Sequence, residues 1–116
     1  MSKERAKGTA WETDVCQYLS VAFPHVKRTG SADFGAGDID VAPGYVIECK
    51  NVQRIDLAAI LDQTEKARVR QGAEFGAAII KRRGKSSPAD AYVLMTGAQL
   101  LYILNCLIEV DEDGRP

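Results

Sequence analysis

Residues 37–50, GDIDVAPGYVIECK, constrain the fold more than any other part of this 116-residue chain. Two short segments rich in β-branched residues flank a Pro-Gly pair, a pattern typical of two β-strands joined by a tight turn. Side chains alternate along the second segment, so Glu48 and Lys50 share one face while Ile47 and Cys49 share the other. We therefore predict a β-hairpin that buries Ile47 and Cys49 and carries charges on its opposite face.

Acidic residues lie on both sides of this turn, with Asp38 and Asp40 before it and Glu48 after it, and the basic Lys50 lies two residues beyond Glu48. Carboxylate oxygens suit a hard divalent cation, and a nearby ammonium group can steady an attacking water or a phosphate. A Glu-x-Lys pattern alone is more often the solvated face of an edge strand. The Asp-x-Asp pair at hairpin distance favours a metal site instead.

The length of the turn decides whether Asp38 and Glu48 can meet, because cross-strand neighbours in a hairpin have residue numbers with a constant sum. A two-residue turn at 43–44 would put the two carboxylates on opposite faces of the sheet. A three-residue connection at 42–44 puts Asp38 directly across from Glu48, with Cβ atoms ~5 Å apart. We predict an odd-length turn or a bulge, and a raised pKa for at least one carboxyl group without metal.

These residues also carry a resemblance to a known family. Asp38 and the run ECK at 48–50 resemble the D…(D/E)-x-K signature of the PD-(D/E)XK nuclease superfamily. The stretch 37–51 is similar to small Holliday-junction-resolvase-like nucleases, including ones carried by phages of actinobacteria, and the resemblance runs from about Lys7 to about Met95. It implies a restriction-endonuclease-like αβββαβ core, Mg²⁺-dependent hydrolysis of DNA with Mn²⁺ able to substitute, and branched DNA as the substrate.

The resemblance implies a role for each candidate residue. It implies as metal ligands Glu12, Asp38, Glu48 and the backbone carbonyl of Cys49. Lys50 would orient the attacking water or stabilise negative charge, because a lysine of ordinary pKa is a poor base. The helix after the hairpin would bring a further side chain to the site, with Gln63 the first candidate and Lys66 the second. Asp40 stays an alternative to Asp38, which matches the family spacing better.

Hydrophobic periodicity predicts an α/β fold in the order αβββαββα, with a mixed sheet flanked by helices. The expected helices are from Lys3 or Thr9 to Ala22, 56–71 and 98–107, and the expected strands outside the hairpin are 25–29, 75–81 and 91–95. Asp56 is the expected N-cap of the second helix and Gly72 its stop, and Thr96 is expected to cap the last helix. Thr9 and Glu12 match a capping box, so Glu12 has a structural alternative in holding a helix start. The last helix is so apolar that it is either core or a dimer surface.

Two segments predict contacts with DNA. The glycine-rich loop at 30–37 contains Ser31 and could approach a phosphate backbone closely. The segment after the strand at 75–81 gathers four cations, and phosphate contact is expected from Lys81, Arg82, Arg83 and Lys85. Lys66 lies on a polar helix stripe and is a further candidate. For each segment the alternative is an ordinary solvated connector or face.

Overall charge is −1, which alone does not favour a nucleic-acid partner. One of the 15 basic and four of the 16 acidic residues lie in 109–116, so the remainder has 14 basic and 12 acidic residues. We expect one domain at 1–108 and an acidic, flexible tail at 109–116. Binding to DNA would depend on local basic patches.

Composition excludes several classes of site. A single histidine disfavours a His-based metal site or a Ser-His-Asp triad. Three dispersed cysteines form no zinc pattern and are expected to be reduced core thiols.

Without an apolar leader or a run of ~20 apolar residues, a cytoplasmic protein is expected, in the host cytoplasm if a phage encodes it. A homodimer is expected, since a symmetric junction needs two cuts. Two functions are alternatives to a junction-resolving nuclease. One is a repair or restriction-type nuclease acting on duplex or flapped DNA, and the other is a non-catalytic DNA-binding module.

Overall fold

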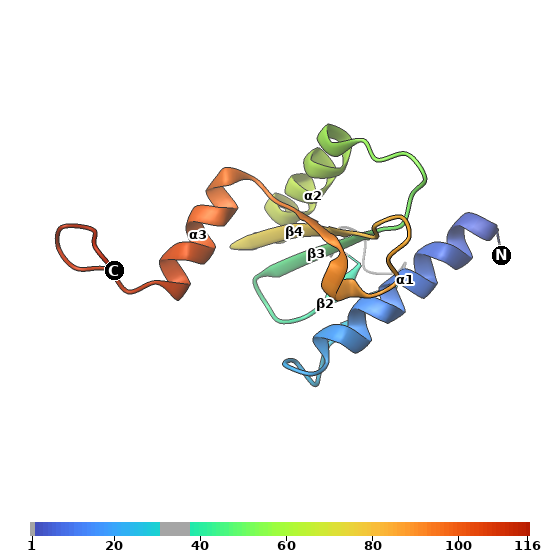
Figure 1. Cartoon of the computed structure of the whole chain (residues 1–116), viewed down its shortest axis with the longest axis horizontal. Coiled ribbons are helices and arrows are strands. Elements are labelled where there is room, and N and C mark those ends of the chain that lie inside the picture. Colours follow the sequence, from blue (N-terminus) through green and yellow to red (C-terminus); the bar gives the residue numbers. More distant parts are fainter. Residues whose placement is uncertain (1, 31–37) are drawn as a thin grey trace.

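The computed structural model of the chain describes residues 2–30 and 38–116 (Figure 1). Its elements are α1 (Lys3–Leu19), β1 (Lys27–Arg28), β2 (Ile39–Asp40), β3 (Tyr45–Lys50), α2 (Leu57–Gln71), β4 (Phe75–Ile80), a 3₁₀ turn (Pro88–Asp90), β5 (Tyr92–Leu94) and α3 (Gly97–Leu107). The predicted α/β class and the order αβββαββα are confirmed, with the short 3₁₀ turn as an addition.

The five strands form one mixed sheet in the order β1-β2-β3-β4-β5. Strands β3 and β4 run parallel and are joined by α2, whereas the other neighbouring pairs are antiparallel. Helix α1 covers one face of the sheet and α2 covers the other (Figure 1). The two central strands are therefore covered on both faces, as parallel strands usually are.

Each face of the sheet has its own core. On the α1 side, Trp11 and Val15 pack against Ile39 and Cys49. The indole N–H of Trp11 also donates a hydrogen bond of 3.1 Å to the carbonyl of Ile79, which fixes α1 on β4. On the α2 side the buried apolar residues are Val46, Ile60, Ala67, Ala73, Ala78 and Ile80. The two faces of β3 are therefore both buried, although the sequence pattern predicted burial of only one.

Local capping explains where the helices begin and end. Asp56 caps α2, and Gly72 ends it with a φ of 62°, a conformation that favours glycine; both predictions are confirmed. Thr96 caps α3, as predicted. The capping box at Thr9 is wrong, because α1 begins at Lys3, where the side chain of Ser2 accepts from the backbone N–H of the third helical residue. No proline lies within 3–19, so one continuous helix forms. The helix ends at Leu19, whereas the sequence predicted an end at Ala22.

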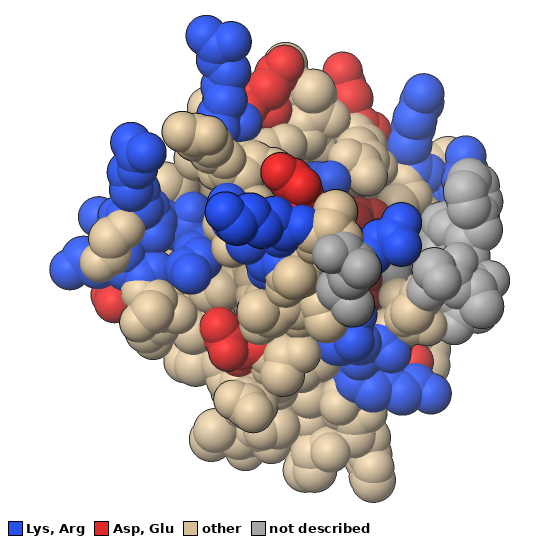
Figure 2. Space-filling model, turned by 90° about the vertical axis from the view of Figure 1, so that its right-hand side faces the viewer, with Lys and Arg blue, Asp and Glu red and all other residues tan. Residues whose placement is uncertain are grey.

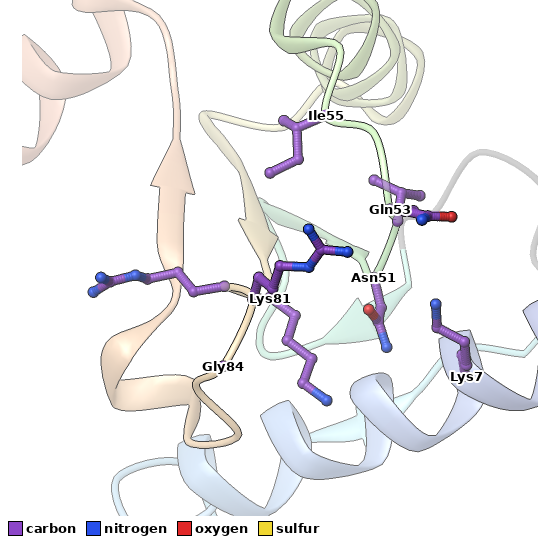
Figure 3. A pocket seen from close by; sticks show the side chains of 9 residues that line it. Lys7, Asn51, Gln53, Ile55, Lys81 and Gly84 are labelled. Atoms are coloured by element: carbon purple, nitrogen blue, oxygen red, sulfur yellow. The ribbon is translucent and has the colours of Figure 1, made fainter.

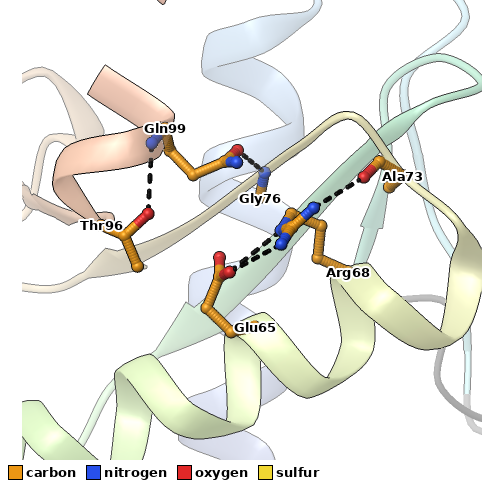
Figure 4. A network of polar contacts seen from close by, with 6 residues as sticks. All are labelled: Glu65, Arg68, Ala73, Gly76, Thr96 and Gln99. Carbon is orange, nitrogen blue, oxygen red and sulfur yellow. Dashed lines mark hydrogen bonds and ion pairs between the residues drawn. The ribbon is translucent and has the colours of Figure 1, made fainter. Parts of the chain in front are cut away.

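Helix α3 is attached to the edge of β4 through side chains (Figure 4). Strand β5 pairs with Ala78–Ile80 and stops short of Gly76. The buried side chain of Gln99 takes the place of a strand partner there, with its Oε1 accepting from the backbone N–H of Gly76 at 2.8 Å. Tyr102, one turn further along α3, donates to the carboxylate of Glu74. Residues on one side of α3 therefore fix the helix beside the sheet.

After α3, residues 108–116 contain neither helix nor strand. The carboxylate of Asp111 accepts from the backbone N–H groups of Asp113 and Arg115 and closes a turn there. Within the described ranges, none of the helices is long and apolar enough to cross a bilayer.

Candidate functional site

The register of the hairpin brings Asp38 and Glu48 to the same place. Ile39 pairs with Ile47, which is the register of the predicted three-residue connection and not that of a two-residue turn. Gly44 has a φ of 88°, which lets the chain reverse at this point. Continuing the pairing by one residue places Asp38 across from Glu48, so the prediction about turn length is confirmed.

Contacts between the two residues agree with this register. A carboxylate oxygen of Asp38, Oδ2, accepts a hydrogen bond of 2.7 Å from the backbone N–H of Cys49. Burial, followed by the charge of Asp38 and a hydrogen bond between the two carboxyl groups, raises the pKa of Glu48 to about 8. The nearby ammonium group of Lys50 lowers this pKa but does not compensate. At neutral pH without a cation, the pair therefore holds a proton.

Glu48 is only 6% exposed, although the simplest interpretation of its sequence pattern was a solvated edge strand. That interpretation is wrong, because β3 is an interior strand and α2 covers the face on which Glu48 lies. A buried carboxyl group is costly to ionise unless a cation or hydrogen bonds compensate. Such a group beside a second carboxylate and an ammonium is typical of a functional site.

Glu12 lies near this pair, in the middle of α1. It lines a cavity of about 390 Å³ together with Asp38, and its charge also raises the pKa of Glu48. Its Oε1 accepts a hydrogen bond of 2.9 Å from the guanidinium of Arg28 on β1. Because α1 begins nine residues earlier, at Lys3, Glu12 has no role in starting the helix. The structure thus brings Glu12 to the candidate site, already engaged in an ion pair.

Of the other described side chains predicted for the site, one lies near the carboxylates of Asp38 and Glu48 and the rest form no hydrogen bond or ion pair with them. Lys50 is half-buried at the end of β3 and acts electrostatically on Glu48. Gln63 and Lys66 are exposed on α2, whose buried side faces the sheet through other residues. Among the residues that the structure describes, neither makes a hydrogen bond or ion pair with the carboxylates. Asp40 is exposed and its backbone pairs with Lys27, so Asp38 is the better-placed aspartate.

Whether these residues fit a divalent cation can be tested on their chemistry. No group of three or more His, Cys, Asp or Glu side chains in the described part of the chain has the geometry of a metal site. Mg²⁺ nevertheless binds commonly through one or two carboxylates, with waters and substrate phosphates completing its shell. Asp38 and Glu48 supply that number, and the proton they hold is what a cation would displace. The thiol of Cys49 is buried in the α1 core, which raises its pKa and leaves only its backbone carbonyl as the predicted ligand.

A basic cavity of about 500 Å³ lies at the carboxyl ends of the parallel strands β3 and β4 (Figure 3). Ligands in open α/β sheets bind preferentially at such ends. The residues that line it include Lys7, Asn51, Gln53, Lys81, Arg82, Arg83 and Gly84. In Figure 3 the side chains of Lys7, Asn51 and Lys81 converge from α1, the loop after β3 and the end of β4. Lys85 is exposed and does not line the cavity, and Ser31 lies outside the described residues.

Sequence reasoning missed Lys7, Asn51 and Gln53, since they are separated from the basic segment along the chain.

Two cationic side chains of the cavity are held in position by aromatic rings. The guanidinium carbon of Arg82 lies 5.2 Å from the ring centre of Tyr92, and the ammonium of Lys81 lies 5.9 Å from that of Trp11. Figure 2 shows Lys and Arg side chains spread over this end of the molecule, with a few acidic side chains between them. This end of the molecule is therefore suited to a polyanion.

Comparisons of the chain with protein-family models, curated proteins and solved structures found no match. We therefore infer function from the geometry of the carboxylates and the basic cavity.

Proposed function

We propose that the protein is a metal-dependent DNA endonuclease that hydrolyses phosphodiester bonds. The observation that carries the proposal is the buried Glu48 opposite Asp38, with the ammonium of Lys50 acting electrostatically on Glu48. Paired carboxylates beside a cation suit the binding of Mg²⁺ and of a phosphate at one place. The order αβββαβ with a parallel β3–β4 pair also supports a restriction-endonuclease-like core.

In this proposal Asp38 and Glu48 would hold the metal, and Glu12 would bind it directly or through water on leaving its contact with Arg28. When bound, Mg²⁺ supplies an aligned water and neutralises charge that builds on the phosphate, and Mn²⁺ can replace it. The backbone N–H of Cys49 orients the carboxylate of Asp38. Lys50 stabilises negative charge near the scissile bond. Glu48 gives up its proton to solvent when the cation binds.

The basic cavity supports DNA as the substrate. It adjoins β3, the strand that carries Glu48, since the N–H of Lys81 donates to the carbonyl of Lys50 at 2.9 Å. Phosphates bound by Lys7, Lys81 and Arg83 would position the strand next to the site of hydrolysis. Branched DNA is the proposed substrate by resemblance to junction resolvases, and duplex or flapped DNA is the alternative.

The test is cleavage of a four-way junction, a flap and a linear duplex side by side, with Mg²⁺ and with EDTA. Asp38→Asn and Glu48→Gln should each lower metal-dependent cleavage by at least ~100-fold while DNA binding persists. Asp40→Asn is the matched control, because it removes an exposed carboxylate two residues from Asp38. Turnover at the wild-type rate in Glu48→Gln would exclude the carboxylate pair as the site of catalysis.

A DNA-binding module without catalysis is the second candidate. The observation that favours it is the ion pair between Glu12 and Arg28, which occupies one of the three acidic side chains. This alternative predicts wild-type protein that binds all three DNA substrates and cleaves none of them with either metal.

A further inference from the structure

The outer face of α3 is unusual for a surface helix. Residues 97–107 contain no charged side chain. Gln99 and Tyr102 attach the inner side to the sheet, whereas Leu100, Leu101, Leu104 and Leu107 are 49%, 60%, 41% and 77% exposed. These four leucines follow the spacing of a single apolar stripe. A surface helix normally turns such a stripe toward the core, whereas here all four leucines are exposed, on a helix that lies at one end of the molecule (Figure 1).

The apolar surface continues beyond the helix. An apolar cavity of about 310 Å³ lies between α3, the sheet and the end of α1, lined among others by Phe23, Val41, Tyr45, Phe75 and Ile103. Ile108, which follows α3, is 40% exposed. Monomeric proteins rarely leave so continuous an apolar surface in water, and such surfaces mark interaction sites.

We propose that a second copy of this chain covers the surface, through antiparallel packing of two α3 helices about a two-fold axis. The leucine stripe and Ile108 together expose on the order of 500 Å² of apolar surface per chain, in the upper part of the range for the largest patch of a monomer, and the apolar cavity beside α3 adds to it. Two copies would bury about 1,000 Å², which reaches the lower limit for a biological interface before any polar rim is counted. The dimer does not depend on the proposed function.

Charge selects the antiparallel arrangement. Four acidic residues follow α3 in the segment 109–113. Parallel helices would bring both acidic segments side by side and make them repel. Antiparallel helices separate them and put each one beside the amino-terminal end of the partner's helix, where the helix dipole favours negative charge.

The stripe is also self-complementary in this arrangement. With the two-fold axis at Leu104, this residue meets its own counterpart. Leu101 then faces the partner's Leu107, and Leu100 faces the partner's Ile108. Each position of the stripe thereby has an apolar partner, which is the requirement for a symmetric interface.

The first experiment measures the mass of the full chain by light scattering and sedimentation over a micromolar dilution series. The expected mass is twice the 12.6 kDa of one chain. Leu104→Glu should weaken dimerisation by at least ~30-fold, since it puts a carboxylate at the axis on both sides. Val69→Glu is the matched control, because Val69 is an apolar residue of α2, 68% exposed, and is not part of the leucine stripe. Far-ultraviolet circular dichroism and melting should show that both variants fold like the wild type.

A second experiment tests the orientation in a Cys106→Ser background. Leu104→Cys should form a disulfide between subunits under oxidation, whereas Leu107→Cys should not, because antiparallel helices bring only the axial residue close to itself. Parallel packing would cross-link both variants and would contradict the proposed arrangement.

A wild-type chain that stays monomeric at every concentration would overturn the inference, and so would a dimer that Leu104→Glu leaves intact. These outcomes are separate from those of the nuclease test. A dimer that cleaves no DNA would refute only the proposed function, and a monomer that cleaves DNA would refute only the interface.

Discussion

The raised pKa of Glu48 makes the stability of the protein depend on pH in a direction that can be measured. The pKa of this carboxyl group rises from 4.5 to about 8 on folding. Between these values the folded state holds one more proton than the unfolded state, so the free energy of unfolding falls as pH rises. The slope is about 1.4 kcal/mol for each pH unit, or on the order of 5 kcal/mol across the window. That loss is comparable with the whole stability of many domains of this size.

Glu48→Gln replaces the protonated carboxyl group by a neutral amide of nearly the same shape. Without metal, we expect the stability of this variant to be almost independent of pH across the window, so that above pH 8 it exceeds the wild type. Metal should instead stabilise the wild type more than the variant. Mg²⁺ at ~100 times its dissociation constant should stabilise the wild type by about 2.7 kcal/mol. The variant lacks one ligand and should gain much less.

The assay is urea unfolding followed by circular dichroism, from about pH 5 to about pH 9, in EDTA and in Mg²⁺. Asp40→Asn serves as the control and should keep both the wild-type slope and the response to Mg²⁺, because Asp40 is exposed and its backbone pairs with β1. The reasoning is refuted if Glu48→Gln retains the wild-type slope in EDTA. Equal stabilisation of both proteins by Mg²⁺ would show that the metal binds elsewhere.

The other two predictions concern the basic cavity and α3. Replacing Lys81 and Arg83 by alanine should weaken DNA binding and lower the slope of log K against log[salt] by ~0.9 for each phosphate that is no longer neutralised. Lys85→Ala, outside the cavity, should change this slope less. Fluorescence anisotropy in a salt series measures both effects. Gln99→Ala should lower the free energy of unfolding by about 1–3 kcal/mol, because the buried N–H of Gly76 loses its acceptor. Denaturant unfolding measures the second effect, and a change below ~0.5 kcal/mol would contradict it.

Local signals in the sequence predicted local features well. The caps at Asp56 and Thr96 and the stop at Gly72 depend on a few neighbouring residues, and each lies where it was predicted. The hairpin register could also be predicted, because a shared site for Asp38 and Glu48 allows only one parity of turn. The cap at Thr9 was wrong since a second signal, Ser2, lies about two turns before it and the helix between them is unbroken.

Features that depend on tertiary packing could not be predicted in the same way. The burial of Glu48 results from α2 returning over the hairpin, and no residue near Glu48 encodes that contact. The basic cavity combines Lys7, the loop after β3 and the end of β4, which are far apart along the chain. For α3, the apolar composition left core and interface as alternatives. Only its attachment through Gln99 shows that the leucine stripe lies outside.

The hydrogen bond from Lys81 to Lys50 extends the β3–β4 ladder one residue beyond the end of β4. It joins the last residue of the acidic hairpin to the first residue of the basic segment by backbone atoms alone. In a nuclease of the proposed kind, this hydrogen bond would fix the distance from the bound phosphates to the cleaved bond, because that distance would be set by the pairing of β3 with β4. Changing side chains in the basic segment would alter how tightly DNA is held but not where it is cut. An inserted residue after Ile80 would move the position of the cut along the strand.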